Sequence, residues 1–200
     1  MQTFLPYADF AQSMASLDDK RLGKQRVEAY QILLQLGGLK MADYPDWQPR
    51  LGGWGSHPAV AMWAGHEIQL AEYIRVCCDE WTSRGSFEEI EVDGQFIETD
   101  IFRNFTDTVK ANTEIALELV RQPDWTDELP AWIGTEAIHR THRSNLLNKD
   151  FDYYGSKFPE DIPKEGEGYL EYIWPKTEFV PRERMVANYE HMVQKKIANF

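Results

Sequence analysis

One stretch of the chain, residues 17–36, has the strongest periodic pattern and constrains the fold most. It reads LDDKRLGKQRVEAYQILLQL, and its apolar residues recur at helical spacing at Leu22, Ala29, Leu33 and Leu36. Such a stripe is typical of a helix that packs on a core. Asp18 or Asp19 can accept hydrogen bonds from the first turn, and Gly37-Gly38 can adopt the left-handed conformation that ends a helix. The sequence therefore predicts a helix over Leu17–Leu36.

The opposite face of this helix is polar and locally cationic. It presents five polar side chains, Arg21, Lys24, Glu28, Gln31 and Gln35. Four cations fall close together in a chain whose net charge is -12: Lys20, Arg21, Lys24 and Arg26. One interpretation is a solvated face with a Lys24–Glu28 pair, worth ~0.3–0.5 kcal/mol. The other is that Glu28 is a catalytic carboxylate and the cations hold an anionic substrate such as phosphate.

Length and composition indicate one domain with a sizeable core. The 200 residues are 13% aromatic, and aromatic side chains bury large areas. We therefore expect a single domain over residues 1–200. The sequence leaves the oligomeric state open and favours a monomer. No run of about 18 apolar residues occurs, so we expect no membrane span. The start, MQTFLPYADF, lacks the basic region of a signal peptide, and the adjacent Cys77 and Cys78 are poorly placed to bridge. These features favour a reducing cytoplasm.

The remaining pattern predicts a mainly α, compact helical bundle. Further helices are expected at residues 8–16, Pro58–Ser83, Asp100–Arg121, Thr135–Asn148 and Pro181–Ala198. Near residues 88–98 the period changes to alternation around Asp93-Gly94, which predicts one small acidic β-hairpin, with a distorted helical connection as the alternative. Residues 149–176 read as a long irregular segment, and such segments are often functional. Gly65 and His66 interrupt the apolar face of the second long helix early, and Gly65 is interpreted as a small residue that permits close helix packing.

A second cationic face is expected on the helix Thr135–Asn148. His139, His142 and Arg143 recur at steps of three and four, and Arg140 flanks them. Histidines at this spacing can ligate a metal, or supply one acid and one phosphate donor. The alternative is a hydrogen-bonded pair that lines the core. His57, just before Pro58, either caps a helix or belongs to the same pocket.

Several blocks together resemble a known family. They are MQTFLPYADF, LDDKRLGKQRVEAYQIL, HPAVAMWAG and AWIGTEAIHRTHRSNLLNKDFDYYG, with Trp174-Pro175 further on. This set resembles the pyrimidine-dimer DNA glycosylase/endonuclease V family of phage and bacteria, in particular one bacterial and phage branch of it. The acidic hairpin and the C-terminal helix are not part of the resemblance.

The resemblance implies a compact all-α fold and a bifunctional DNA glycosylase and abasic-site lyase. In that chemistry the free amine of the first residue attacks the sugar carbon that bears the damaged base and forms an imine. A family stretch that ends in the assisting glutamate matches Asp19–Glu28 without a gap, so Glu28 inherits the role of catalytic carboxylate. The Met1 amine is then the candidate nucleophile, and an unperturbed α-amine has a pKa of ~7.7–8.0, which leaves a useful neutral fraction.

The chain departs from the family pattern at several points. Gln2 stands where the studied enzyme exposes threonine after losing its methionine, and so large a second residue predicts that Met1 is retained. Gln31 replaces an arginine one turn beyond the glutamate. The histidine-rich helix has no catalytic equivalent, and the chain is acidic where that enzyme is basic. A protein of this charge binds DNA only if its cations gather on one face.

The sequence thus predicts a DNA-repair enzyme, a DNA glycosylase that cleaves an N-glycosidic bond at a damaged or modified pyrimidine in duplex DNA, with an open question over its lyase step. The expected catalytic residues are Glu28, Met1, His139 and His142. The expected substrate-binding residues are Arg21, Lys24, Arg26, His57, Arg140 and Arg143. No cofactor and no metal are expected.

Two alternatives stay open at this point. One is a metal-assisted nucleotide hydrolase, with His57, His139, His142 and Glu28 as ligands. The other is a non-catalytic acidic binding or regulatory protein that keeps the fold.

Overall fold

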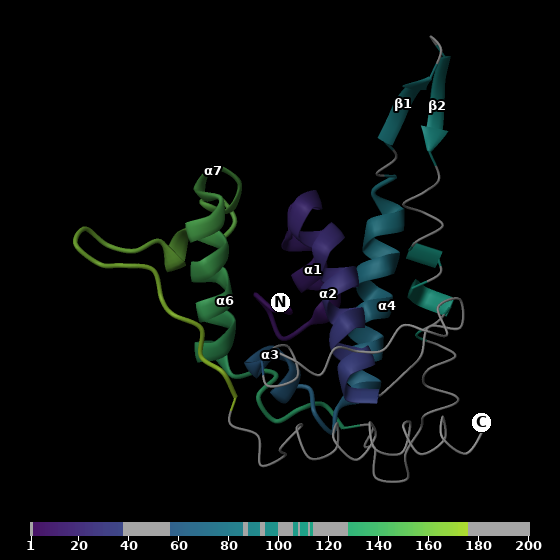
Figure 1. Cartoon of the computed structure of the whole chain (residues 1–200). Coiled ribbons are helices and arrows are strands. Elements are labelled where there is room, and N and C mark those ends of the chain that lie inside the picture. The colour runs from purple at the N-terminus through teal and green to yellow at the C-terminus, as the bar shows by residue number, and fades with distance from the viewer. Residues whose placement is uncertain are drawn as a thin grey trace, which may run out of the picture.

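The computed structural model describes residues 2–37, 57–85, 88–92, 95–99, 106–107, 109–111, 113 and 128–175. The described part is mainly α, as predicted, and its elements surround the N-terminal segment (Figure 1). The helices are α1 (Phe10–Ser16), α2 (Asp19–Gly37), α3 (Pro58–Ala61), α4 (Glu67–Ser83), α6 (Glu136–Lys149), α7 (Phe151–Tyr154) and the 3-10 turn η1 (Pro159–Asp161). The strands are β1 (Glu88–Val92) and β2 (Gln95–Thr99).

The helix predicted over Leu17–Leu36 is α2, shifted by one or two residues. Asp18 precedes it, and its Oδ1 accepts a hydrogen bond from the Arg21 backbone N–H at 2.9 Å, which is the expected cap. The predicted apolar stripe is buried, at Leu22, Ala29, Leu33 and Leu36. Helix α2 packs along α4, and this pair forms one side of the core (Figure 1).

The single helix predicted over Pro58–Ser83 is wrong, because the structure divides it into α3 and α4. Residues 62–65 form a turn, and Gly65 has a φ of 83°. That left-handed conformation interrupts the helical hydrogen-bond ladder and is costly for any residue with a Cβ. A Cβ on Gly65 would meet nothing within 4 Å, so its interpretation as a packing glycine is also wrong. His57 caps α3, since its Nδ1 accepts from the Ala59 N–H at 3.1 Å.

The acidic hairpin forms as predicted. Strands β1 and β2 pair in antiparallel register, with Glu88 opposite Thr99 and Val92 opposite Gln95. In Figure 1 the hairpin extends beyond the end of α4.

The C-terminal half is described in part. Helix α6 confirms the helix predicted over Thr135–Asn148, and the segment after it is irregular apart from α7 and η1. Residues 106–107, 109–111 and 113 are helical, and the rest of the predicted helix Asp100–Arg121 lies outside the described residues, as does Pro181–Ala198. No described helix is long and apolar enough to cross a membrane.

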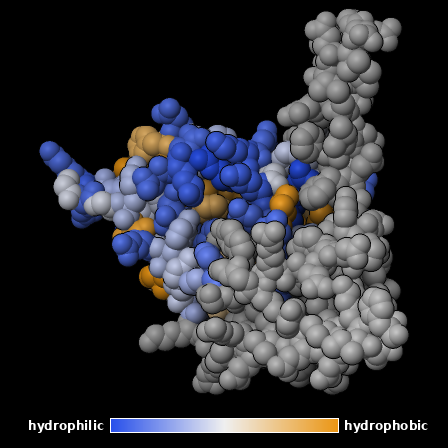
Figure 2. All heavy atoms as spheres, viewed as in Figure 1, coloured by the Kyte–Doolittle hydropathy of each residue, from blue (hydrophilic) through white to orange (hydrophobic). Residues whose placement is uncertain are grey.

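The N-terminal segment runs between α2 and α6 (Figure 1). Residues 2–6 are all buried, although they belong to no helix or sheet. Phe4 and Leu5 pack into the core from the start of the chain. The face of the molecule in Figure 2 is mostly hydrophilic over the described residues, with small separate apolar spots.

The glycine that permits a close helix approach is Gly23, on α2. A Cβ there would lie 2.9 Å from Cζ3 of Trp81, whose ring also stacks on the Arg26 guanidinium at 4.5 Å. Alanine favours a helix over glycine by about 1 kcal/mol, whereas overpacking costs about 1–3 kcal/mol.

We expect Gly23→Ala to lower the free energy of unfolding by about 1 kcal/mol, because displacement of the Trp81 ring outweighs the gain in helix propensity. Urea unfolding measures this change. Gln31→Ala, at an exposed position of the same helix, is the control and should be neutral or stabilising. A stabilised Gly23→Ala protein would contradict the close packing of Trp81 on α2.

Candidate active site

Helix α2 holds the N-terminal segment through two side chains one turn apart. The Gln2 backbone N–H donates to Glu28 Oε2 at 2.9 Å, and the Phe4 N–H donates to Gln25 Oε1 at 2.7 Å. Alternate residues of an extended segment face the same way, so Gln2 and Phe4 meet one helix face. The Tyr73 hydroxyl, from α4, donates to Phe4 O at 2.9 Å, so that both backbone polar groups of Phe4 are hydrogen-bonded. These bonds fix the start of the chain against α2.

Helix α6 holds the same segment from the other side. The Leu5 N–H donates to His142 Nδ1 at 2.8 Å, and Leu5 O lies 2.8 Å from His139 Nδ1. His139 Nε2 accepts from the Gly134 N–H at 3.0 Å, so its Nδ1 carries the proton and donates to Leu5 O. Arg143 Nη1 donates to Pro6 O at 2.8 Å. Both histidines thus bind backbone. We call the four side chains that hold residues 2–6 from the two helices the clamp: Glu28 and Gln25 from α2, and His139 and His142 from α6.

The environment of His142 keeps its ring neutral. Burial, reinforced by the neighbouring His139, lowers the pKa of His142 to about 3. Because Nδ1 accepts from Leu5, the proton resides on Nε2, which lies 3.3 Å from the side-chain amide of Gln2. A protonated Nε2 requires an acceptor, which assigns the amide oxygen of Gln2 to the side that faces the ring.

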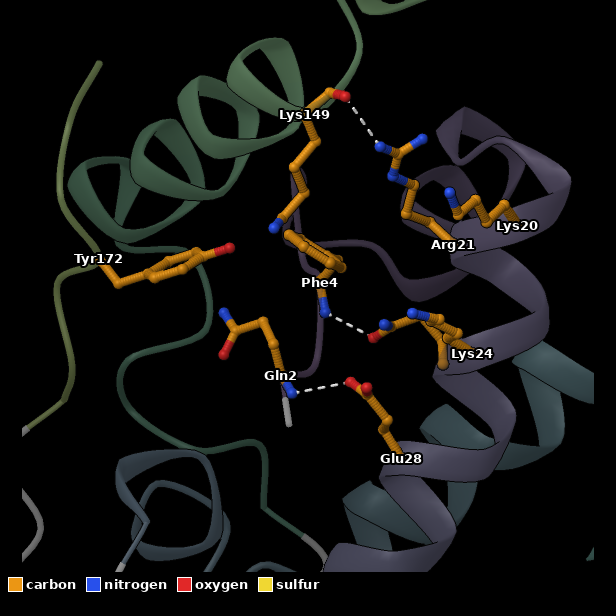
Figure 3. A pocket seen from close by; sticks show the side chains of 9 residues that line it. Gln2, Phe4, Lys20, Arg21, Lys24, Glu28, Lys149 and Tyr172 are labelled. Carbon is orange, nitrogen blue, oxygen red and sulfur yellow. Dashed lines mark hydrogen bonds between the residues drawn. The ribbon is translucent and has the colours of Figure 1, made fainter. Parts of the chain in front are cut away.

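A pocket of about 450 Å³ opens beside the clamped segment. Its lining residues are Gln2, Phe4, Lys20, Arg21, Lys24, Gln25, Glu28, Lys149 and Tyr172. Figure 3 shows two facing walls: α2 supplies the side chains from Lys20 to Glu28, while Lys149 and Tyr172 approach from the side of α6. Gln2 and Phe4 lie between these walls.

The pocket is cationic, in contrast to the chain as a whole. Lys20, Lys24 and Lys149 form no salt bridge with the part of the chain that the structure describes. Arg21 is held in place, because its guanidinium binds Asp18 at 2.9 Å, Asp150 at 3.2 Å and the Lys149 carbonyl at 3.0 Å. Such a group of cations suits a phosphate ligand.

Among the described residues that line this pocket, one carries a carboxylate, and it is Glu28. It is half-buried and accepts the Gln2 N–H. It forms no salt bridge with Lys24 or with another described cation, so the alternative of a solvated Lys24–Glu28 pair is not what the structure shows. A carboxylate without a cationic partner, beside a cationic pocket, can stabilise a developing positive charge or accept a proton.

The other predicted substrate-binding residues lie away from the pocket. Arg26 is buried on the α4 side of α2, where its Nη1 donates to Thr106 Oγ1 at 2.5 Å and burial lowers its pKa. Arg140 and Arg143 bind Asp161, at η1. The pocket lining thus contains neither these three arginines nor the two histidines of α6.

His57 and Met1 complete the predicted set. His57 caps α3 and its ring lies 5.8 Å from that of Trp174, outside the pocket lining. Burial lowers the pKa of His57, and the negative charge of Glu28 opposes that shift. Met1 lies outside the described residues.

Sequence reasoning missed four polar residues of the pocket, Gln2, Gln25, Lys149 and Tyr172, and left Lys20 out of the binding set. Gln25 carried a usable signal, because it lies three positions before Glu28 and the two therefore share a face. Lys149 and Tyr172 lie in the segment 149–176 that was expected to be functional, but no spacing singled them out within it.

The described residues offer no ready metal site. No group of three or more His, Cys, Asp or Glu side chains in the described ranges is arranged to hold an ion. Backbone groups engage both ring nitrogens of His139 and the Nδ1 of His142. The ligand set of the alternative hydrolase, which joins these two histidines to His57 and Glu28, therefore lacks enough free ligand atoms for a metal ion.

Comparison with known families bears on the same region. Residues 1–93 match the family model of the pyrimidine dimer DNA glycosylases. This match confirms the family resemblance of the blocks within residues 1–93, whereas the blocks around α6 and Trp174-Pro175 lie outside it. The matched stretch contains the clamped N-terminal segment, α2 with Glu28, α3 and α4, whereas Lys149 and Tyr172 lie beyond it. No curated protein and no solved structure matched the chain.

The buried, neutral His142 predicts a dependence of stability on pH. Its unfolded pKa is about 6.5 and its folded pKa is about 3, so below pH 6.5 the unfolded chain binds a proton that the folded protein does not. We expect this residue to remove about 2 kcal/mol from the free energy of unfolding as the pH falls from 8 to 5, with most of the loss below pH 6.5.

Urea unfolding of wild type and His142→Gln over that interval measures the contribution. The variant should be less stable at pH 7, because Leu5 loses its acceptor, but its stability should fall less steeply with acid. Equal slopes for the two proteins would contradict a neutral, buried His142.

Proposed function

We propose that the protein is a DNA glycosylase that cleaves the N-glycosidic bond of a damaged or modified pyrimidine, with an abasic-site lyase step that uses the amine of Met1. The observation that carries the proposal is the hydrogen bond from the Gln2 N–H to Glu28, inside a cationic pocket. The family match over residues 1–93 supports a DNA glycosylase-type function on pyrimidine dimers.

In this proposal the amine and the carboxylate act as a pair. The amine belongs to the residue bonded directly to Gln2, whose backbone nitrogen lies 2.9 Å from Glu28 Oε2. The neutral amine attacks C1′ of the sugar as the bond to the base breaks, and the base leaves with the bonding electron pair. Glu28 stabilises the positive charge on the sugar and takes the proton that the amine loses.

The nitrogen lone pair then opens the sugar ring: the C1′–O4′ bond breaks, O4′ takes the proton held by Glu28, and the C1′–N bond becomes an imine. The lyase step follows from this imine. Loss of a proton from C2′ and departure of the 3′ phosphate complete a β-elimination, and Glu28 is the base within reach of this chemistry. The pocket lysines Lys20, Lys24 and Lys149, which form no salt bridge with the described residues, hold the flanking phosphates. His139 and His142 act as positioning residues, since they fix Leu5 and thereby the start of the chain.

The charge distribution fits a DNA substrate for an acidic chain. Net charge is -12, so attraction to DNA arises at the pocket and not over the whole surface. Binding should be weak on undamaged duplex and strongly dependent on salt. An extruded nucleotide places its sugar within reach of the pocket.

Borohydride trapping tests the proposal. The protein is incubated with duplexes that carry an abasic site or a pyrimidine dimer, and borohydride reduces any imine to a stable covalent complex. We expect wild type to form the complex, chemical blocking of the N-terminus to abolish it, and Glu28→Gln to slow its formation on the dimer by about 100-fold or more. Glu72→Gln, at an exposed carboxylate on α4, is the matched control and should react like wild type.

A complex that forms equally well with a blocked N-terminus would contradict the amine mechanism. No complex, with binding to the damaged duplex intact, would remove the lyase step.

A further inference from the structure

A segment outside the matched family region forms one wall of the pocket. Residues 169–174 run along α6, and hydrogen bonds between their backbone and side chains of α6 hold them there. The Leu170 N–H donates to Ser144 Oγ at 2.9 Å, and Asn145 Nδ2 donates to Leu170 O at 2.8 Å. The Ile173 N–H lies 3.4 Å from Thr141 Oγ1. We call these residues the strap.

The strap brings Tyr172 into the pocket. Its ring is oriented by three aromatic neighbours, with centroid separations of 5.6 Å to His142, 6.4 Å to Phe4 and 5.5 Å to Trp174. Of these neighbours, His142 holds the N-terminal segment and Phe4 belongs to that segment. Figure 3 shows the hydroxyl pointing into the space between the two walls, on the side opposite Glu28. These ring contacts fix the position of the hydroxyl relative to the N-terminal segment.

The Tyr172 hydroxyl has no hydrogen-bond partner among the residues that the structure describes, although the side chain lines the pocket and is half-buried. Because this hydroxyl faces the open pocket, a ligand there can accept a hydrogen bond from it. Burial, and then the charge of Glu28, raises the pKa of Tyr172. The hydroxyl thus stays protonated and acts as a donor, and not as a base.

We propose that Tyr172 is a substrate-binding residue whose hydroxyl donates a hydrogen bond to a sugar or phosphate oxygen of the nucleotide in the pocket. This inference rests on the proposed function, since it names the group that the strap wall contributes to the same site. The nearest charged side chain on that wall is Lys149, which supplies a point charge for the same sugar–phosphate backbone (Figure 3). The ligand is then bound from two walls: by Lys24 and Glu28 from α2, and by Lys149 and Tyr172 from the α6 side.

Binding to a duplex with a tetrahydrofuran abasic analogue tests the inference. The analogue has no aldehyde and cannot form an imine, so binding is measured apart from chemistry. We expect Tyr172→Phe, which keeps the ring contacts, to raise Kd by about three- to tenfold, as the loss of one hydrogen bond does. Tyr169→Phe is the matched control, because Tyr169 lies on the same strap but outside the pocket lining, and its Kd should equal that of wild type.

The salt dependence of Kd separates the neutral donor from a cation. Tyr172→Phe should keep the wild-type slope of log Kd against log salt, whereas Lys149→Gln should reduce the slope by about 1. An unchanged thermal midpoint of each variant shows that its fold is kept. An unchanged Kd for Tyr172→Phe would overturn the inference.

The two proposals fail in different ways. A wild-type protein that binds the analogue but yields no trapped complex contradicts the amine mechanism, while the loss of affinity in Tyr172→Phe still supports the strap contact. A wild-type protein that traps on a pyrimidine dimer while Tyr172→Phe binds the analogue normally supports the glycosylase and overturns the role of Tyr172.

Discussion

The structure depends on how an extended, buried backbone is kept hydrogen-bonded. Residues 2–6 have no neighbouring strand, and each buried N–H or C=O left unpaired would cost about 1–3 kcal/mol. Polar side chains replace the missing strands, Glu28 and Gln25 from α2, and His139 and His142 from α6. The clamp sets the distance between these two helices. The pocket is the space that remains beside the segment.

This arrangement gives several polar side chains a role that resembles catalysis in the sequence but is positional in the fold. The two histidines of α6 bind Leu5, and Arg143 binds Pro6 and Asp161. Glu28 differs from them, because it both accepts the Gln2 N–H and lines the pocket. A single carboxylate can therefore hold the start of the chain and face the ligand. The lysines that line the pocket with it reverse, at one place, the negative charge of the whole protein.

The sequence was a good guide wherever a local period decides the structure. The apolar stripe of α2 and the hairpin around Asp93-Gly94 follow from spacing alone. The sequence showed an interruption at Gly65 but not that the helix ends there. A glycine at positive φ and a glycine in a tight contact look alike, and the tight contact is at Gly23. Arg26 was expected to bind substrate, with a buried position nearer the apolar side as the alternative. The structure has the buried position, because two residues from Lys24 is about 200° around a helix. Tyr172 joined the site through tertiary packing, which no local pattern encodes.

Hydrogen exchange at the backbone amide of Leu5 tests the central claim most directly, because this N–H is bonded to His142 inside the clamp. The account predicts that NMR will find its exchange rate within about tenfold of the slowest core amides of α2, whereas the Gln12 amide, in an exposed first turn, exchanges far faster. An exchange rate for Leu5 as fast as that of Gln12 would mean that the start of the chain is not clamped. The pairing of residue 2 with Glu28, and the site built on it, would then be contradicted.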